Sequence, residues 1–561
     1  MDFKQKAEEK KMSMSKNIAR LAVTAGLTAA LSFGGVMAPV TMAFAEGVEN
    51  GSVTITNASN NVTNFKGYKI FDANVAKDEN GQTLVSNITW ANEKVETAVK
   101  GAITEINSTA NISTAQDAAD WIKNNVTGTD ETTCVASSSA AYKIAVAVSA
   151  VTGLDSTDCT TTSNGAASDL SHGYWLFVTD ASTVADAEAA TAPIFTVVGD
   201  DPINITEKTS IPTVEKRVRE GTEWGKVSDS QIGEKIEYKL TGSVASNIDT
   251  FTTYKYEFHD HLSVGLEADK ASVKVTIGDK VIQSSNGYTV NLADTTDASG
   301  NLTGGHDLSI SFTDLKAAAK AAGVTLKGDS KVVVTYEAKL TDKAEYTATG
   351  NTNDVKLVYS NNPMVDGTGT SESDEVTDYV FGLDVTKTAS DDSQKKLVAG
   401  FKVKMIKEGT TPVAGDKWLT KTGGLTSNSG DAGVFKTSET DSKVFIPGLV
   451  AGEYEITECE TPAGYNSISF TITVTPTYDE TTGKLTKLTV TDSSNMVTSE
   501  LDKEVDSTKI PVTIQNKKGS GLPLTGLNGV TFTWIAGGAV LCIGVAHLIR
   551  SRKQAEESEQ E

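Results

Sequence analysis

The chain is poor in the residues on which most enzymes and disulfide scaffolds depend. It has five histidines and four cysteines in 561 residues, which leaves few candidates for a general base or a metal ligand and excludes a disulfide framework. Eleven prolines and 47 glycines argue against a collagen-like or wholly disordered chain. Basic residues are outnumbered by acidic ones, 50 to 73, and the net charge of −23 disfavours a nucleic-acid partner. We therefore expect no cofactor, no metal site and no enzyme with a soluble substrate.

Threonine, valine, serine and asparagine are abundant instead, and this composition favours strands and turns. Apolar residues make up 38% of the chain, enough to build several cores, and the length predicts three or four domains. We expect a mainly β protein made of tandem immunoglobulin-like β-sandwiches, with short helices added to the first. Turn-rich boundaries in the sequence reduce the count to three domains in a line.

Residues 1–45 have the three parts of a cleaved secretory signal peptide. Basic residues precede an apolar stretch from Leu21 to Val40, and Ala43-Phe44-Ala45 supplies a small-x-small cleavage site. A membrane anchor is the alternative. Gly, Ser and Pro dilute the apolar stretch, so we expect cleavage after Ala45.

The opposite end, residues 519–561, contains a run from Val530 to Ile549 that is apolar and long enough to cross a hydrocarbon core of about 30 Å as a transmembrane helix. Arg550, Arg552 and Lys553 follow at once. Positive charge next to a span favours the cytoplasmic side, so everything between the two apolar segments is expected to face outward.

The segment Leu522-Pro523-Leu524-Thr525-Gly526 stands just before this span. Together with the span and the basic tail, it resembles the LPxTG sorting signal of Gram-positive cell-wall proteins, which is a substrate of sortases. The resemblance implies cleavage between Thr525 and Gly526 and transfer of Thr525 to an amine. A chance LPLTG in a linker is the alternative. The implied location is the cell surface, covalently attached to the wall, with a precursor held transiently in the membrane.

Turn-rich boundaries divide the exported part into three units. Residues 46–205 mix strand-like pieces with helical stretches near 91–106 and 114–125. Residues 206–378 and 379–518 each show the alternation and turn spacing of a β-sandwich, and the first of these two units is expected to contain a short helix near 313–322. Cys134 and Cys159 fall in the first unit, where an exported location is compatible with a disulfide. Two free thiols are the alternative.

The third unit contains Tyr454-Glu-Ile-Thr-Glu458-Cys-Glu-Thr-Pro-Ala-Gly-Tyr465. This segment resembles the E-box, YxLxETxAPxGY, of Gram-positive pilins and collagen-adhesin B-type domains, although Cys459 and Thr461 depart from it. In those domains the E-box glutamate promotes a spontaneous Lys-Asn isopeptide bond. The resemblance implies Lys387 on the first strand as nucleophile, Asn516 on the last strand as electrophile, and Glu458 beside them.

Such a bond has a physical basis. Burial disfavours the ammonium form of a lysine and the ionised form of a carboxyl group, so a nucleophilic amine and a proton donor can coexist. Folding supplies their proximity to the amide. The ordinary alternative is an exposed strand lysine, a capping asparagine and a solvated glutamate.

The second unit resembles the fimbrial isopeptide-forming domain, which opens with Pro-Thr-x-x-Lys. This motif places Lys216 as the nucleophile, and the strand Tyr256-Glu-Phe-His-Asp260 places Asp260 as the acid. Asn353 fits the start of the closing strand as the electrophile, with Asn351 as a competitor. His259 and His261 lie on the opposite strand face, and a metal there lacks further ligands.

Polymerisation requires an acceptor amine. The junction Ile203-Asn-Ile205-Thr-Glu-Lys208 has the V-x-V-x-x-K spacing of the pilin motif of pilus backbones, but lacks its Trp, Tyr and Pro. Lys208 is therefore the candidate acceptor. Alternatively it is a linker lysine, and Lys216 or another lysine accepts.

These resemblances imply a major (backbone) pilin subunit, joined by sortase between Thr525 of one copy and Lys208 of the next. The implied partners are sortase, neighbouring copies, minor or tip pilins, cell-wall peptidoglycan and a possible host receptor that supports adhesion. The rival hypothesis is a monomeric wall-anchored adhesin built from the same domains. An enzyme is the third reading, but the only chemistry we find in the sequence is single-turnover self-crosslinking.

Overall fold

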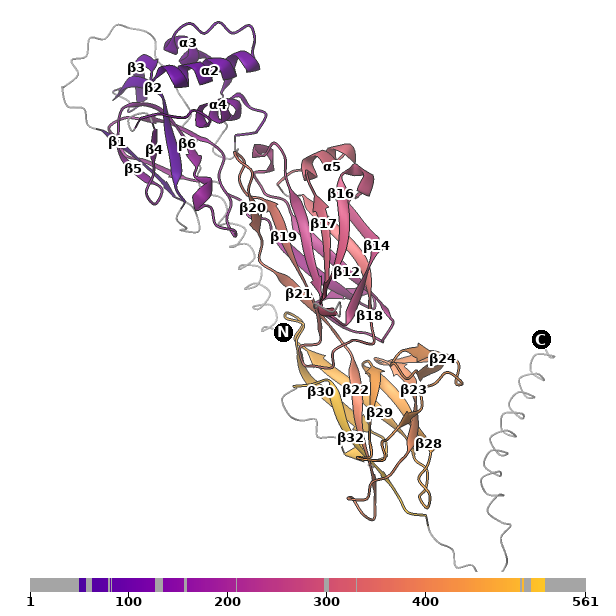
Figure 1. Cartoon of the computed structure of the whole chain (residues 1–561). Helices are drawn as coiled ribbons and strands as arrows, with labels where there is room; N and C mark the ends of the chain where they lie inside the picture. The colour runs from indigo at the N-terminus through magenta and orange to yellow at the C-terminus, as the bar shows by residue number, and fades with distance from the viewer. Residues whose placement is uncertain are drawn as a thin grey trace, which may run out of the picture.

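The computed structural model describes residues 50–56, 63–78, 81, 83–126, 135–155, 159–207, 209–296, 302–328, 330–494, 497–498 and 506–519. Three bodies rich in β-structure follow one another along these residues (Figure 1). The expectation of a mainly β chain with several tandem sheets is confirmed. The predicted signal peptide, sorting motif and transmembrane span lie outside the described residues. Within the described part, no helix is both long and apolar enough to cross a bilayer.

The N-terminal domain combines two sheets with a helical cover. One sheet has the order β5-β1-β8, the other the order β3-β2-β6-β7, and β4 pairs with β2. The elements are β1 (Gly51–Thr56), β2 (Phe65–Lys77), β3 (Thr83–Trp90), α2 (Glu93–Ile106), α3 (Ala115–Asn125), α4 (Ala140–Ser149), β4 (Cys159–Thr161), β5 (Ala166–Leu170), β6 (Gly173–Thr179), η1 (Ala181–Thr183), β7 (Ile194–Val198) and β8 (Ile203–Thr206).

Two of the three helices occupy the predicted stretches. Asn92 caps α2 by accepting from the backbone of Val95, and Thr114 and Asp117 form a capping box on α3. The third helix, α4, was not expected from the sequence. Its β-branched residues Ile144, Val146 and Val148 alternate with alanines and favour a strand, yet the segment is capped by Ser139 and packs against α2 as a helix.

The second domain is a sandwich of two larger sheets. Their orders are β10-β9-β12-β18-β14-β15 and β11-β21-β19-β13-β17-β16, with β20 paired to β19. The elements are β9 (Val214–Glu220), β10 (Glu223–Gly225), β11 (Val227–Asp229), β12 (Lys235–Ser243), η2 (Ile248–Thr250), β13 (Tyr256–Leu262), β14 (Leu266–Ile277), β15 (Lys280–Ile282), η3 (Ser284–Asn286), β16 (Tyr288–Thr296), β17 (Leu302–Phe312), α5 (Leu315–Ala321), β18 (Lys331–Leu340), β19 (Asn351–Ser360), β20 (Thr368–Thr370) and β21 (Asp374–Tyr379). The helix expected near 313–322 is α5.

The third domain is a smaller sandwich with the orders β27-β22-β32-β31 and β25-β24-β23-β28-β29-β30, and β26 pairs with β23. Its first and last long strands, β22 and β32, are parallel neighbours. The elements are β22 (Phe381–Ala389), β23 (Gly400–Glu408), β24 (Thr411–Leu419), β25 (Leu425–Thr426), β26 (Phe435–Lys436), β27 (Lys443–Leu449), β28 (Gly452–Glu460), β29 (Ser469–Tyr478), β30 (Leu485–Asp492), β31 (Val497–Thr498) and β32 (Lys509–Asn516).

Polar and aromatic contacts join the second and third domains. The Tyr379 ring stacks on Tyr478 with centroids 5.4 Å apart, and the Tyr379 hydroxyl accepts from the backbone of Leu485. Asp229 accepts hydrogen bonds from the Tyr478 hydroxyl and the Ala451 backbone, both at 3.0 Å. The last residue of β11, Asp229, therefore contacts the third domain.

Glycines allow a close backbone approach at the same joint. Gly448 has a φ of +83°, and a Cβ built there would lie 1.9 Å from the carbonyl oxygen of Gly423. We expect Gly448→Ala to lower the unfolding free energy of the third domain by about 3 kcal/mol, because the residue is left-handed and the backbone must move apart.

The matched control is Gly409→Ala, which also has a positive φ of +54° but has no atom within 4 Å of the added methyl group. It should cost only about 1 kcal/mol. Scanning calorimetry of the full chain checks both variants, and equal effects would contradict the steric account.

Candidate functional site

The period-2 alternation of two strands directs a lysine into each of the two C-terminal sandwiches. On β9, Lys216 shares the inward phase with Val218, and on β22, Lys387 shares it with Val385. Both lysines have a relative exposure of 0%. Since lysine is rarely fully buried without partners, the groups around each amine define the candidate sites.

In the second domain the amine of Lys216 contacts both side chains predicted to be its partners, Asp260 and Asn353. Its Nζ donates to Asp260 Oδ1 at 2.5 Å and to Asn353 Oδ1 at 2.6 Å. Asp260 and Asn353 come from the neighbouring strands β13 and β19 of the sheet opposite β9. The three side chains therefore bridge the two layers of the sandwich.

Asn351 is the competitor that the sequence could not exclude, and the structure places it elsewhere. Its Oδ1 accepts from the backbone of Glu345 at 2.9 Å, and its Nδ2 donates to the carbonyl of Asp378 at 3.2 Å. No hydrogen bond joins it to Lys216 within the described residues. The geometry thus favours Asn353 as the partner of Lys216.

Two further residues of this site were missed. The buried hydroxyl of Tyr336 on β18 accepts from Asn353 Nδ2 at 2.8 Å and from Lys216 Nζ at 3.3 Å. Asp374 at the start of β21 accepts from the backbone nitrogen of Lys216 at 2.6 Å and also binds the amine of Lys226. The inward phase of Tyr336 can be read from its strand, but the sequence gives no sign that its hydroxyl reaches another sheet.

The third domain brings together the residues implied by the E-box resemblance. Lys387 on β22 donates from Nζ to Asn516 Oδ1, and Asn516 ends the adjacent strand β32. Glu458 projects from β28 in the opposite sheet, and both its carboxyl oxygens lie 2.9 Å from Asn516 Nδ2. Glu458 Oε1 lies 3.9 Å from Lys387 Nζ. Here lysine and asparagine share one sheet and the acid comes from the other.

Burial shifts the titration of all four ionisable groups toward their neutral forms. It lowers the pKa of Lys216 and raises that of Asp260, and the attraction between these two groups opposes both shifts. In the third domain, burial lowers the pKa of Lys387 to about 8 and raises that of Glu458, which hydrogen bonds to Asn516 partly offset. A neutral amine next to an amide carbonyl can act as a nucleophile, and a protonated carboxyl group can supply the proton that the leaving nitrogen needs.

Several predicted features cannot be placed. Lys208, Cys134 and the segment 522–526 lie outside the described residues, so the acceptor lysine, the Cys134–Cys159 disulfide and the sorting motif remain predictions. His259 is exposed on the outer face of β13, away from the buried Asp260. In the described part of the chain, no group of three or more His, Cys, Asp or Glu side chains is arranged to hold a metal ion.

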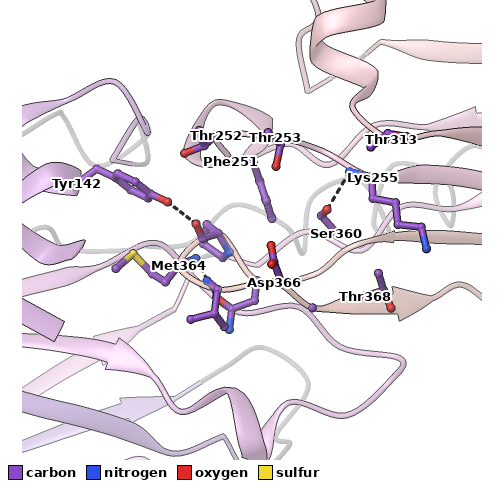
Figure 2. Close-up of a pocket in the computed structure, with 14 residues that line it drawn as sticks. Tyr142, Phe251, Thr252, Thr253, Lys255, Thr313, Ser360, Met364, Asp366 and Thr368 are labelled. Carbon is purple, nitrogen blue, oxygen red and sulfur yellow. Dashed lines mark hydrogen bonds between the residues drawn. The ribbon is translucent and has the colours of Figure 1, made fainter. Parts of the chain in front are cut away.

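A pocket of about 680 Å³ lies where the N-terminal domain meets the second domain (Figure 2). Tyr142 reaches into it from α4, and its hydroxyl donates to the Pro363 carbonyl at 2.5 Å. Lys255 and Asp366 are the charged residues of the lining. No residue that lines the pocket belongs to the lysine, asparagine and acid groups of the second and third domains. The pocket is therefore separate from both candidate sites.

One family matches part of the chain. Residues 382–492 match SpaA, described as a prealbumin-like fold domain. The matched range contains Lys387 and Glu458 and ends before Asn516. No curated protein sequence matches the chain.

Solved structures are similar to the chain at low sequence identity. The T6 backbone pilin of serotype M6 Streptococcus pyogenes, described as a modular three-domain structure, is 15% identical with a TM-score of 0.49, and the match covers 84% of this chain and 99% of that one. The full-length major pilin SpaD from Corynebacterium diphtheriae is 17% identical with a TM-score of 0.45, covering 84% and 98%. The major pilin SpaA from the same organism is 14% identical with a TM-score of 0.41, covering 84% and 100%.

The lowered pKa of Lys387 predicts how stability depends on pH when no crosslink can form. We expect the unfolding free energy of the third domain in an Asn516→Ala variant to rise by about 2–3 kcal/mol between pH 8 and pH 10.5. In that window the folded state has released the proton of Lys387 while the unfolded state still holds it, so raising the pH favours folding.

The control is the double variant Asn516→Ala, Lys387→Met, which shares every other titrating group. Pulse proteolysis in urea, with mass spectrometry of peptides from residues 382–516, measures the stability of both chains. Parallel pH profiles for the two variants would show that Lys387 is not the group responsible.

Proposed function

We propose that the chain is the backbone subunit of a covalently assembled surface pilus, and that its second and third domains are each closed by a Lys-Asn isopeptide bond. The observation that carries the proposal is that two consecutive sandwiches each bury a lysine amine in contact with an asparagine amide, with a carboxyl group beside the pair. Burial of an ammonium group that forms no covalent bond would destabilise each sandwich, because its desolvation costs several kcal/mol.

The proposed bonds form without an enzyme. The neutral amine attacks the amide carbon of asparagine, the carboxyl group moves the protons, and ammonia leaves. Lys216 joins Asn353 with the help of Asp260, and Lys387 joins Asn516 with the help of Glu458. Since folding holds the reacting groups in contact, much of the entropic barrier is removed before the reaction starts.

The positions of these bonds suit a chain under tension. Lys216 lies near the start of the second domain, and Lys387 lies on the first strand of the third domain, whose partner Asn516 ends the last strand. Force entering the third domain passes from Lys387 directly to Asn516, so residues 388–515 carry none of it. In the second domain, residues 217–352 are bypassed in the same way.

The sequence supplies the rest of the proposal. Sortase cleaves between Thr525 and Gly526 and joins Thr525 to Lys208 of the next copy, and the last subunit is attached to peptidoglycan. Minor or tip pilins and a host receptor complete the proposed partners. A monomeric wall-anchored adhesin would share the same domains and sorting motif, and it differs by having no acceptor lysine.

Intact mass of the purified ectodomain tests the internal bonds. Each bond removes one ammonia, about 17 Da, so we expect the ectodomain to be lighter than its sequence by the mass of two ammonia molecules. Lys216→Met and Lys387→Met should each abolish one loss and leave the other. Lys404→Met, which removes a surface lysine paired with Asp416, is the matched control and should retain both. A wild-type ectodomain with its full sequence mass would refute both crosslinks.

Co-expression of the full chain with a pilus-type sortase tests polymerisation. We expect a ladder on a denaturing gel and a Thr525–Lys208 crosslinked peptide by mass spectrometry, and we expect Lys208→Ala to reduce the chain to monomers. Lys255→Ala is the control, because Lys255 is a partly exposed lysine at the boundary between the same two domains. Monomers alone in the wild type, or a ladder that survives Lys208→Ala, would refute the assignment.

A further inference from the structure

The two buried sets differ in how the acid meets the amide that must lose ammonia. In the third domain both oxygens of Glu458 contact Asn516 Nδ2 directly. In the second domain Asp260 Oδ1 contacts the lysine amine instead, and its Oδ2 makes no regular hydrogen bond within the described residues. The acid of the second domain is therefore placed to exchange a proton with the nucleophile, but it has no direct contact with the leaving nitrogen.

Tyr336 lies next to both Asp260 and the leaving nitrogen of Asn353. Its side chain is 1% exposed, and its hydroxyl oxygen accepts hydrogen bonds from both reacting side chains, Asn353 Nδ2 at 2.8 Å and Lys216 Nζ at 3.3 Å. A tyrosine hydroxyl has one proton to donate and can accept two. Both contacts use it as an acceptor, so its own proton is free for the carboxyl group of Asp260. Tyr336 indeed lies close enough to Asp260 to lower the pKa of that group against the larger raising effect of burial.

We propose that Tyr336 is a catalytic residue of crosslink formation in the second domain, where its hydroxyl relays a proton from Asp260 to the departing nitrogen of Asn353. This inference rests on the proposed Lys216–Asn353 bond and assigns its proton path. The third domain needs no such relay, because the longer side chain of Glu458 reaches the amide nitrogen itself.

The steps balance without any other reactant. The neutral amine of Lys216 attacks Cγ of Asn353, the Nζ–Cγ bond forms, and the carbonyl electron pair moves onto Oδ1. At the tetrahedral carbon Nδ2 gains a free electron pair and can accept a proton. The Tyr336 hydroxyl then turns its proton from Asp260 to Nδ2 and takes the proton of Asp260 in exchange. The electron pair on Oδ1 re-forms the carbonyl, the Cγ–Nδ2 bond breaks, and ammonia leaves. The surplus proton on Nζ returns to Asp260, which ends protonated as it began.

A neighbouring tyrosine offers a matched control. Tyr238 is cross-strand partner to Tyr336, and the two rings stack with centroids 5.3 Å apart. The amine of Lys216 lies 5.4 Å from the centre of the Tyr238 ring and 5.6 Å from that of Tyr336. The Tyr238 hydroxyl also lies near Asn353, but it makes no hydrogen bond of regular geometry within the described residues. Replacing either tyrosine by phenylalanine removes one buried hydroxyl and keeps both rings.

The test is a time course of crosslinking. The full chain is captured unfolded in urea directly after cell-free synthesis, refolded by dilution, and followed by intact mass and by the Lys216–Asn353 crosslinked peptide. We expect Tyr336→Phe to slow formation of this bond by about 100-fold or more, the usual effect of losing a positioned proton donor. The Lys387–Asn516 bond should form at the wild-type rate, and Tyr238→Phe should leave both rates within a few-fold of wild type.

The outcomes distinguish a failure of the Tyr336 relay from a failure of the isopeptide bonds themselves. Equal rates of the Lys216–Asn353 bond in Tyr336→Phe and Tyr238→Phe would overturn the relay, whereas a wild-type chain that never loses ammonia would overturn the crosslinks themselves. A fluorinated tyrosine at position 336 guards against a folding defect, since it changes the acidity of the hydroxyl with little change of shape. The relay requires a changed rate in that chain, and an unchanged rate contradicts it.

Discussion

The exclusion of water from two lysine amines is the constraint on which the second and third domains depend. An ammonium group in a sandwich core loses its hydration, at a cost of several kcal/mol that an adjacent acid repays only in part. The same loss pushes the amine toward its neutral form and makes it a nucleophile. Once Lys216 or Lys387 has become an amide, no charge remains to be hydrated. Burial thus favours the neutral amine that reacts. When the reaction is complete, the desolvation cost of the ammonium group is removed.

The two domains meet this constraint with different geometries. In the second domain the lysine comes from one sheet, and the acid and the amide come from the other, so the proposed bond ties the layers together. In the third domain Lys387 and Asn516 lie on adjacent parallel strands of one sheet, so the proposed bond ties the beginning of the domain to its end. The same three chemical groups, an amine, an amide and a carboxyl group, therefore meet on two different strand arrangements. For this reason the residues around them differ between the two domains.

Much of this could be predicted from the sequence, because strand alternation and local motifs are short-range properties. The sandwich pattern, the E-box glutamate and the inward phase of both lysines can all be read from it. The choice between Asn351 and Asn353 could not, since two residues apart on one strand they face the same core. Contacts with Glu345 and Asp378 occupy Asn351, and these depend on how distant segments fold together. The role of the Tyr336 hydroxyl was missed for the same reason. Helix α4 was missed because its β-branched residues favour a strand.

A crystal structure of the mature ectodomain at atomic resolution tests the central claim most directly. The account predicts continuous density between Lys216 Nζ and Asn353 Cγ and between Lys387 Nζ and Asn516 Cγ, each at the length of an amide bond, about 1.33 Å. Separate side chains at hydrogen-bond distance, about 2.9 Å apart, in either domain would contradict it.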